Sequence, residues 1–328
     1  MKTKLSLSIL FGLSSTLLAS PIGWWRFQEA GATDGATLSS ATSTVNTGTL
    51  DGNISGSPRY SSNVPGTAIY DPLSNSVYGN AFSVDGTAGG SRINVNNNAL
   101  LNNPNAFTVE FFIRLVGEPG SYESFIQRLD TTHTTGSSDP TLRDYRRWQI
   151  DYDHGANGNQ YGDIRSRWDL HDPALEVNNV GEGQTDYNSV IRGEQFFVDT
   201  ATGSNNPGDY GAGDAALEGD GINDDPNSWH HVAITFDGIN RVEMFMDYQL
   251  GTGRNLNGTY VHPDGQLRFG KLSNSGYGLF IDEVRYSDRV LAPTEFLIAI
   301  PEPSAGGLLF FGAILTGVFS RIYRRKGQ

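Results

Sequence analysis

The sequence predicts an all-β fold in which antiparallel strands form two packed sheets. Of its 328 residues 40 are glycine and none is cysteine, and Gly, Asn, Asp, Ser and Thr residues separate short apolar runs. Two of these runs, 107–113 and 231–236, alternate with a period of two, which indicates strands with one buried face. Short alternating runs between turn residues are typical of a β-sandwich and argue against a helical bundle.

The clearest hairpin is predicted for residues 231–247. Even-numbered residues from Val232 to Phe236 would face the core, and odd-numbered residues from His231 to Thr235 would face the other way. Asp237-Gly238 supplies the turn, because glycine tolerates positive φ. After the return strand comes Asp247-Tyr248, where Tyr disfavours positive φ, so the sequence leaves this second turn type open.

Several of these runs resemble the laminin-G-like, concanavalin A-like jelly-roll domains of bacterial surface proteins. WHHVAITFDG at 229–238 is similar to the central hairpin of that family, and FTVEFFIR at 107–114 is similar to its F-T-V-E-F-W strand. LFIDEVRY at 279–286 resembles its I-D-E-V-R run, and GWWRFQE at 23–29 its first strand. The resemblance implies an antiparallel two-sheet jelly roll over residues 21–298.

The resemblance covers residues 130–228 only loosely, and we expect a long polar insertion there. One hairpin is predicted inside it, between residues 147–153 and 162–168, while 199–228 has the composition of a long loop. Before the insertion, residues 124–128 are predicted to pair with the strand at 107–114 across a glycine-containing turn.

Charge divides the chain into three regions, although the net charge is −13. Residues 1–20 carry two lysines and no acid, and residues 301–328 carry four basic residues against one acid, so the body between them carries −18. An acidic body does not suit nucleic acid as a partner. It suits a solvated surface or, alternatively, divalent cations.

Residues 1–20 have the composition of a signal peptide. Lys2 and Lys4 precede an apolar run from Leu5 to Leu18, and a cut near Ala19 would release the body on the far side of the membrane. An uncleaved N-terminal anchor is the alternative interpretation, and absence of cysteine is compatible with export.

Residues 299–328 form a separate segment, in which a Pro-Glu-Pro motif precedes an uncharged run and a basic cluster. From Pro303 to Ser320 the run has 18 residues, long enough at 1.5 Å per residue to cross a bilayer core of about 30 Å. The basic cluster would then lie in the cytoplasm. The residues that carry this pattern are Pro301, Glu302, Pro303, Arg321, Arg324 and Arg325.

This order of features is similar to the PEP-CTERM sorting signal of Gram-negative envelope proteins. The similarity implies processing by an exosortase-type enzyme, and a simple C-terminal anchor, a transmembrane helix, is the alternative. Both interpretations place the body in the cell envelope or outside the cell, held transiently or stably at the membrane.

The sequence argues against an enzyme. Glycoside hydrolysis needs two carboxylates across a groove, and hydrolases of this fold often carry E-x-D-x-x-E on one strand, a run that is absent here. Asp282 and Glu283 are adjacent in a strand, so they are predicted to face opposite ways. There is neither a cysteine nor a serine in a G-x-S-x-G turn to act as nucleophile.

Calcium is the cofactor that the resemblance suggests, because domains of this fold often hold one Ca²⁺ where the first and last strands meet. Its ligands would be the carboxylates of Glu29 and Asp282 and the carbonyl of Gly86, which are oxygen ligands of the kind that Ca²⁺ prefers. The alternative is that Glu29 and Asp282 are a surface acid and a turn acid.

A binding or adhesion domain, with a glycan or matrix component as ligand, is the function that the resemblance implies. Such a module should expose aromatic side chains on a loop rim or concave face, and Tyr187 and Tyr210 are the candidates. A structural surface protein without a specific ligand and a glycoside-active enzyme on the same fold are the alternatives.

Overall fold

The computed structural model describes residues 21–88, 90–102, 105–116, 123–129, 146–153, 163–168, 189–195, 228–255, 263–272 and 277–301. All the strand pairs in these ranges are antiparallel, which confirms the predicted all-β class. The helical elements are short: α1 (Ala99–Asn102) and the 3-10 turn η4 (Pro293–Glu295). Within the ranges given, no helix has the length and apolar character needed to span a membrane. The signal peptide predicted at 1–20 and the segment 302–328 lie outside them and stay predictions.

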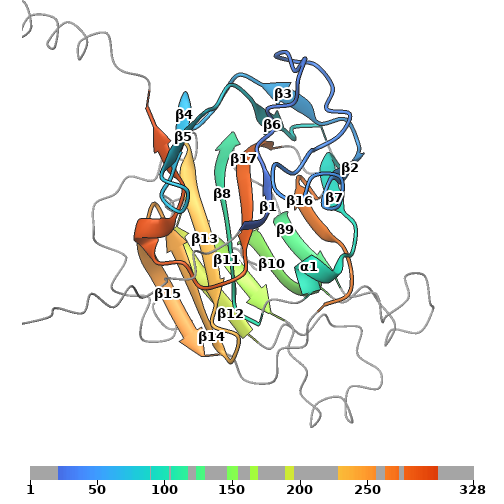
Figure 1. The fold of residues 1–328 in the computed structure, drawn as a ribbon. Coiled ribbons are helices and arrows are strands. Elements are labelled where there is room, and N and C mark those ends of the chain that lie inside the picture. The colour runs from blue at the N-terminus through green and yellow to red at the C-terminus, as the bar shows by residue number, and fades with distance from the viewer. Residues whose placement is uncertain are drawn as a thin grey trace, which may run out of the picture.

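The first sheet has eight strands, with β8 and β17 at its centre (Figure 1). In spatial order its strands are β15 (Gln249–Asn255), β14 (Arg241–Met246), β13 (His230–Phe236), β8 (Phe107–Val116), β17 (Gly278–Ser287), β6 (Ser83–Asp85) and β3 (Arg59–Ser61), with β1 (Pro21–Trp25) also paired to β17. The predicted hairpin of β13 and β14 therefore lies beside the central strands.

The second sheet has seven strands and includes part of the predicted insertion. Its strands are, in order, β12 (Ser189–Gln195), β11 (Asp163–Trp168), β10 (Arg146–Asp153), β9 (Glu123–Leu129), β16 (Leu267–Gly270), β7 (Arg92–Val95) and β2 (Gly52–Ser55). The predicted pairing of 147–153 with 162–168 is confirmed. The pairing predicted for 124–128 with 107–114 is wrong, because β9 pairs with β10 and β16 in the opposite sheet.

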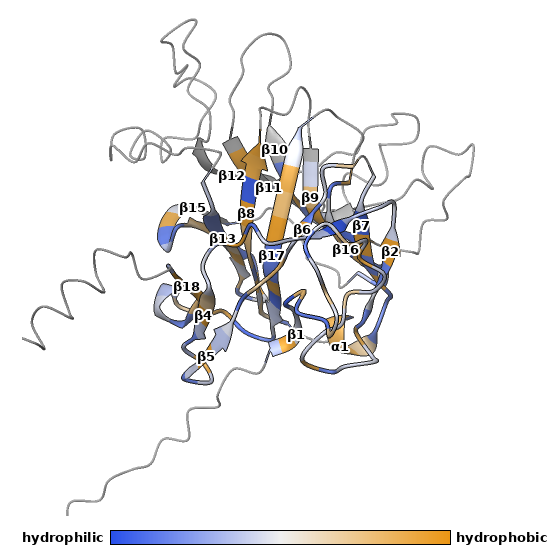
Figure 2. Cartoon of the chain, turned by 90° about the horizontal axis from the view of Figure 1, so that it is seen from above, coloured by the Kyte–Doolittle hydropathy of each residue, from blue (hydrophilic) through white to orange (hydrophobic). Residues whose placement is uncertain are grey.

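The main core lies between these two sheets. The even-numbered residues from Val232 to Phe236 are buried in it, as the alternation predicts. Phe107 of the first sheet stacks on Trp148 and Trp168 of the second, with ring centroids 5.7 and 6.0 Å apart. Figure 2 shows hydrophobic stretches along β8 and β17 in the middle of the molecule. Large aromatic rings thus join the two sheets across the core.

A third, small sheet covers the outer face of the first sheet. It consists of β18 (Ile298–Ile300), β4 (Ala68–Asp71) and β5 (Ser76–Gly79), joined in that order (Figure 1). Ile69 and Leu297 pack against Trp24 and Phe112, which point away from the main core. The first sheet is therefore buried on both faces in this region, an arrangement that the sequence analysis did not anticipate.

The two turns around β14 differ in how they reach positive φ. Gly238 has φ 82°, and a Cβ placed on it would lie 2.7 Å from the carbonyl oxygen of Asn105, so this turn requires glycine. Asp247 and Tyr248 have φ 47° and 71°. Two consecutive left-handed residues are typical of a type I′ turn, and here neither is glycine. The Tyr248 ring stacks on His231, 4.7 Å between centroids, which helps to hold it there.

Candidate ligand-binding site

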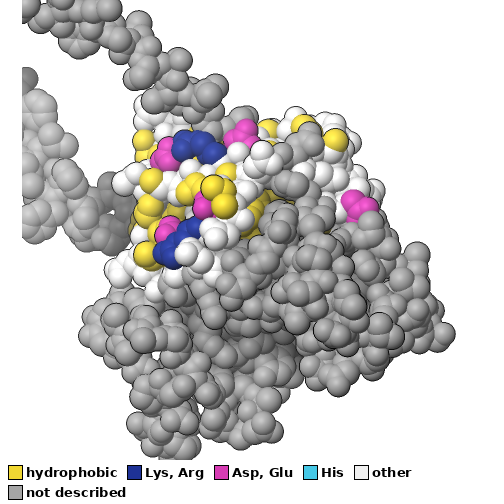
Figure 3. Space-filling model, turned by 90° about the horizontal axis from the view of Figure 1, so that it is seen from below, with side chains coloured by type: hydrophobic (Ala, Val, Ile, Leu, Met, Phe, Trp, Pro, Cys, Tyr) yellow, Lys and Arg dark blue, Asp and Glu magenta, His cyan; other side chains and the backbone are white. Residues whose placement is uncertain are grey.

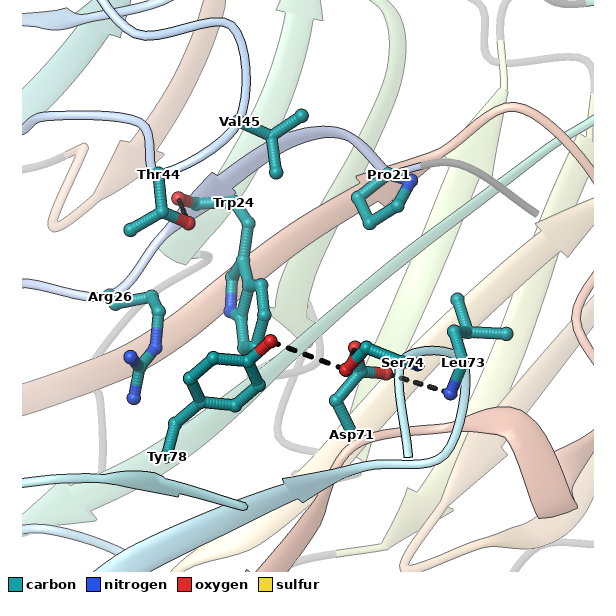
Figure 4. Close-up of a pocket in the computed structure, with 9 residues that line it drawn as sticks. All are labelled: Pro21, Trp24, Arg26, Thr44, Val45, Asp71, Leu73, Ser74 and Tyr78. Carbon is teal, nitrogen blue, oxygen red and sulfur yellow. Dashed lines mark hydrogen bonds between the residues drawn. The ribbon is translucent and has the colours of Figure 1, made fainter. Parts of the chain in front are cut away.

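A pocket of about 400 Å³ opens between β1 and the β4–β5 hairpin (Figure 4). The rings of Trp24 and Tyr78 meet edge to face in its wall, with centroids 5.1 Å apart and an interplanar angle of 85°. The residues that line it are Pro21, Trp24, Arg26, Thr44, Val45, Asp71, Leu73, Ser74 and Tyr78. Pockets of this size, apolar with a few polar groups, are typical of small-molecule sites.

Strand alternation at the N-terminal edge places Trp24 and Arg26 in this pocket. Trp25 and Phe27 point into the main core, so Trp24 and Arg26 point outward. The Arg26 guanidinium lies 5.0 Å from the Trp24 ring centroid and 4.8 Å from that of Tyr78, within the range of cation–π attraction. The guanidinium therefore contacts both rings and stabilises their positions in the pocket wall.

The β4–β5 hairpin supplies the polar groups of the opposite wall. Asp71 accepts a hydrogen bond of 2.7 Å from the Ser74 hydroxyl and one of 3.0 Å from the Leu73 amide. The hydroxyls of Ser74 and Tyr78 lie 3.3 Å apart. Since Ser74 is exposed and Tyr78 is half-buried, both hydroxyls can also reach a bound molecule.

A buried charge network lies behind the hairpin. Arg285 contacts the Asp71 carboxylate at 2.6 Å and the Glu110 carboxylate at 2.7 Å. Glu110 also lies 2.9 Å from His231 Nε2 and accepts a hydrogen bond of 2.8 Å from the Leu297 amide. Burial alone would raise the pKa of Glu110, but Arg285 and His231 outweigh it and hold that pKa below its usual range. The network ties the wall of the pocket to the centre of the first sheet.

Asp282 and Glu283 face the same way, so the prediction of opposite faces is wrong. A register shift in β17 and a φ of 51° at Glu283 form a bulge, and the flanking Ile281 and Val284 both enter the main core. A bulge adds one residue and breaks the alternation. The two carboxylates therefore lie together on the outer face of the sheet.

Glu283 is the acid that holds the pocket wall. Its carboxylate accepts a hydrogen bond of 2.6 Å from the Trp24 indole and pairs with Arg26 at 3.1 Å. Burial raises the pKa of Glu283 to about 7, although Arg26 acts to lower it. Burial and the neighbouring Glu283 carboxylate raise the pKa of Asp282 well above its usual range.

The residues expected to bind calcium have protein partners of their own. Glu29 accepts hydrogen bonds from the Thr42 amide at 2.9 Å and the Tyr60 hydroxyl at 3.1 Å. Both oxygens of Asp282 are also engaged, one by the Asn80 side chain at 2.8 Å and one by the Glu283 amide at 2.9 Å.

The third expected calcium ligand, Gly86, donates its amide to the Leu279 carbonyl at 2.8 Å. Among the residues that the structure describes, no group of three or more His, Asp or Glu side chains could hold a metal ion. Calcium at Glu29, Asp282 and Gly86 stays a prediction.

The ligand-binding candidates Tyr187 and Tyr210 lie outside the described residues, as do Glu302, Pro303, Arg321, Arg324 and Arg325, whereas Pro301 is exposed at the end of β18. No sequence pattern predicted the hairpin residues Asp71, Ser74 and Tyr78 as part of a site. One signal for the pocket was present, because alternation turned Trp24 and Arg26 away from the core.

No family model and no curated protein sequence matches this chain. Its structure is similar to the ligand-binding domain of botulinum neurotoxin serotype D in complex with N-acetylneuraminic acid, with a TM-score of 0.50 and 12% identity over 90% of this chain and 52% of that one. The chain has a β-sandwich fold of the kind seen in that domain. The binding domain of Paraclostridial Mosquitocidal Protein 1 is also similar, with a TM-score of 0.47 and 13% identity over 80% of this chain and 49% of that one. The chain thus spans about half the length of these neighbours.

Proposed function

We propose that this chain is a non-catalytic binding protein of the cell envelope, and that it binds a glycan in the pocket between Trp24 and Tyr78. The observation that carries the proposal is the combination of aromatic rings, a guanidinium, a carboxylate and hydroxyls around one pocket. A sugar offers C–H groups to rings and hydroxyls to polar side chains, so it fits such a lining. The sialic acid complex of the neurotoxin domain supports the proposal by analogy of fold.

The lining of the pocket favours binding over hydrolysis. Asp71 is the one carboxylate among the described residues that line it, and Arg285 and Ser74 engage that carboxylate. Hydrolysis of a glycosidic bond takes two carboxylates separated by about 5–9.5 Å. Asp282 and Glu283 are fully buried and cannot act on a bound sugar.

The location belongs to the same proposal and rests on the sequence. The lysine-flanked apolar run at 1–20 supports export, and the segment 299–328 supports sorting by an exosortase-type enzyme or anchoring through the membrane. Calcium at Glu29 and Asp282 would be an additional element of the same exported domain.

A glycan array probed with the full-length chain tests the proposal. Tyr78→Ala and Ser74→Ala should each weaken binding about tenfold or more, because each removes a ring face or a hydroxyl that a sugar would contact (a tenfold change is about 1.4 kcal/mol). Ile239→Ala is the control, since Ile239 is 75% exposed on the β13–β14 turn and does not line the pocket. If the unmodified chain binds no glycan, the protein is a structural surface protein instead.

A further inference from the structure

The outward face of the third sheet is apolar and open to solvent. Strand register places Ile298, Tyr70 and Val77 in one row across the sheet, and Ile300 beside Ala68 in the next row of the same face. Val77 is 60% exposed, Ile298 38% and Ile300 37%. The residues of the opposite parity, Ile69 among them, point toward the first sheet. We call Ala68, Tyr70, Val77, Ile298 and Ile300 the outward face.

The outward face also lacks charge, in a body that carries −18. From residue 66 to 81 and from 298 to 301 the only Asp, Glu, Lys, Arg or His residue is Asp71, which is buried and paired with Arg285. By contrast, apolar, basic and acidic side chains are intermixed on the face of the molecule seen in Figure 3. Edge strands are normally protected by charged side chains. The edge strands of this sheet, β18 and β5, carry none, so the uncharged face fits a contact with an apolar partner.

The position of the outward face in the chain indicates which partner that is. β18 ends at Ile300, and the uncharged run of 18 residues begins at Pro303. Three residues span at most about 10 Å, so the outward face lies within about that distance of the point where the run begins. A run inserted in a bilayer would therefore bring the outward face to the bilayer surface.

We propose that the outward face rests on a lipid bilayer, at the boundary between headgroups and acyl chains. The inference depends on the membrane segment in the proposed function. Val77, Ile298 and Ile300 would leave water there, and Tyr70 would place its ring in the interface, where tyrosine is favoured. Because the body is acidic, a zwitterionic surface suits it better than an anionic one.

The size of the outward face favours a membrane over a second copy of the chain. Three strands of three or four residues, about 4.8 Å apart with a rise of about 3.3 Å per residue, cover roughly 200 Å². A stable protein interface buries about 800 Å² on each partner. A small apolar patch beside an inserted segment needs no such area, because the segment itself supplies the attachment.

The absence of cysteine allows a direct test with single-cysteine probes. The full-length chain carrying Val77→Cys, labelled with an environment-sensitive fluorophore, is reconstituted into phosphatidylcholine vesicles that contain spin-labelled lipid. We expect emission from position 77 to be quenched at least threefold more than emission from Ile239→Cys, the control on the exposed β13–β14 turn. Ile298→Cys should behave like Val77→Cys.

The outcomes separate the inference from the proposed function. A chain that floats with the vesicles but shows equal quenching at 77 and 239 overturns the inference and leaves the membrane segment intact. A chain that does not float with vesicles overturns both the inference and the membrane segment, while glycan binding is still decided by the array. A probe at 77 that is shielded from water but not quenched by spin-labelled lipid identifies a second copy as the partner and overturns the lipid assignment.

Discussion

The two faces of the first sheet are both buried, but by different chemistry. Phe111 and its neighbours on the inner face pack against apolar side chains of the second sheet. Glu110, the residue before Phe111 in β8, lies on the outer face, fully buried with Arg285 and His231 as partners. The inner face is stabilised by removal of apolar surface from water. The outer face depends on each buried charge keeping its partner.

The two faces show that the buried fraction of a side chain does not by itself determine how that side chain stabilises the sheet. On the inner face a neighbour can shift and still exclude water, so the loss at one site is limited by repacking. On the outer face an unpaired carboxylate or guanidinium has no water to replace its partner. The comparison predicts that mutations on the two faces respond differently to pH.

The largest effects should come from Glu110→Ala and Phe111→Ala, measured by urea unfolding. Each should lower the free energy of unfolding by about 3–5 kcal/mol at pH 7, one by leaving Arg285 buried without a partner and the other by opening a cavity. The pKa of Glu110 is depressed, so its contribution is present above about pH 4.5 and lost as the pH falls through its lower, folded-state pKa. The loss caused by Glu110→Ala should therefore be smaller at a pH well below 4.5 than at pH 7, while the loss caused by Phe111→Ala should be the same at both. A Glu110→Ala loss that is equal at the two pH values would contradict the proposed difference between the faces.

A smaller effect is expected between pH 6 and pH 8 from Glu283. Its pKa is raised to about 7, so its contribution is fully present below the unfolded value of 4.5 and is lost as the pH rises through about 7. The free energy of unfolding should fall by about 1 kcal/mol over this range. Glu283→Gln should remove that slope in thermal unfolding while Glu243→Gln, at a partly exposed position, should keep it. A slope unchanged by Glu283→Gln would assign the pH dependence to another group.

The smallest effect is expected where the first sheet meets solvent. Arg241 and Glu243 form a pair at 3.1 Å with side chains 40% and 30% exposed, and such pairs contribute about 0–1 kcal/mol. Arg241→Gln should change the midpoint of urea unfolding little. A loss as large as that of Glu110→Ala would mean that ion pairing, rather than burial, sets the cost on the outer face.

The sequence predicts the inner face well and the outer face poorly, for a physical reason. Alternation around 107–113 and 231–236 identifies the core residues, because one apolar face against one polar face is the pattern it detects. Glu110 and His231 fall on the polar side of that pattern and would be assigned to solvent. They are buried because the rings of Tyr248 and Phe296 lie against His231 and the chain at Leu297 lies against Glu110. These covering residues lie in a turn and an irregular segment, which carry no periodic signal.

The pocket escaped prediction for a related reason. Tyr78 and Asp71 come from one short hairpin, Trp24 from β1 and Arg26 from the residue after it, so the site forms only when the third sheet packs on the first. The bulge at Glu283 also lies beyond simple alternation, since it needs positive φ at a non-glycine residue. Two adjacent acids between apolar residues, Ile281 and Val284, were the one local sign of it.

The outer network also has a consequence for the order of assembly. Trp24 and Glu283 are 259 positions apart, and Asp71 and Arg285 are 214 apart. The N-terminal partners, Trp24 and Asp71, are synthesised long before the C-terminal ones. They therefore stay exposed to water until β17 has been synthesised. Contacts of such high sequence separation carry a large loop-closure entropy and slow the search for the native topology. The outer layer is thus expected to close last.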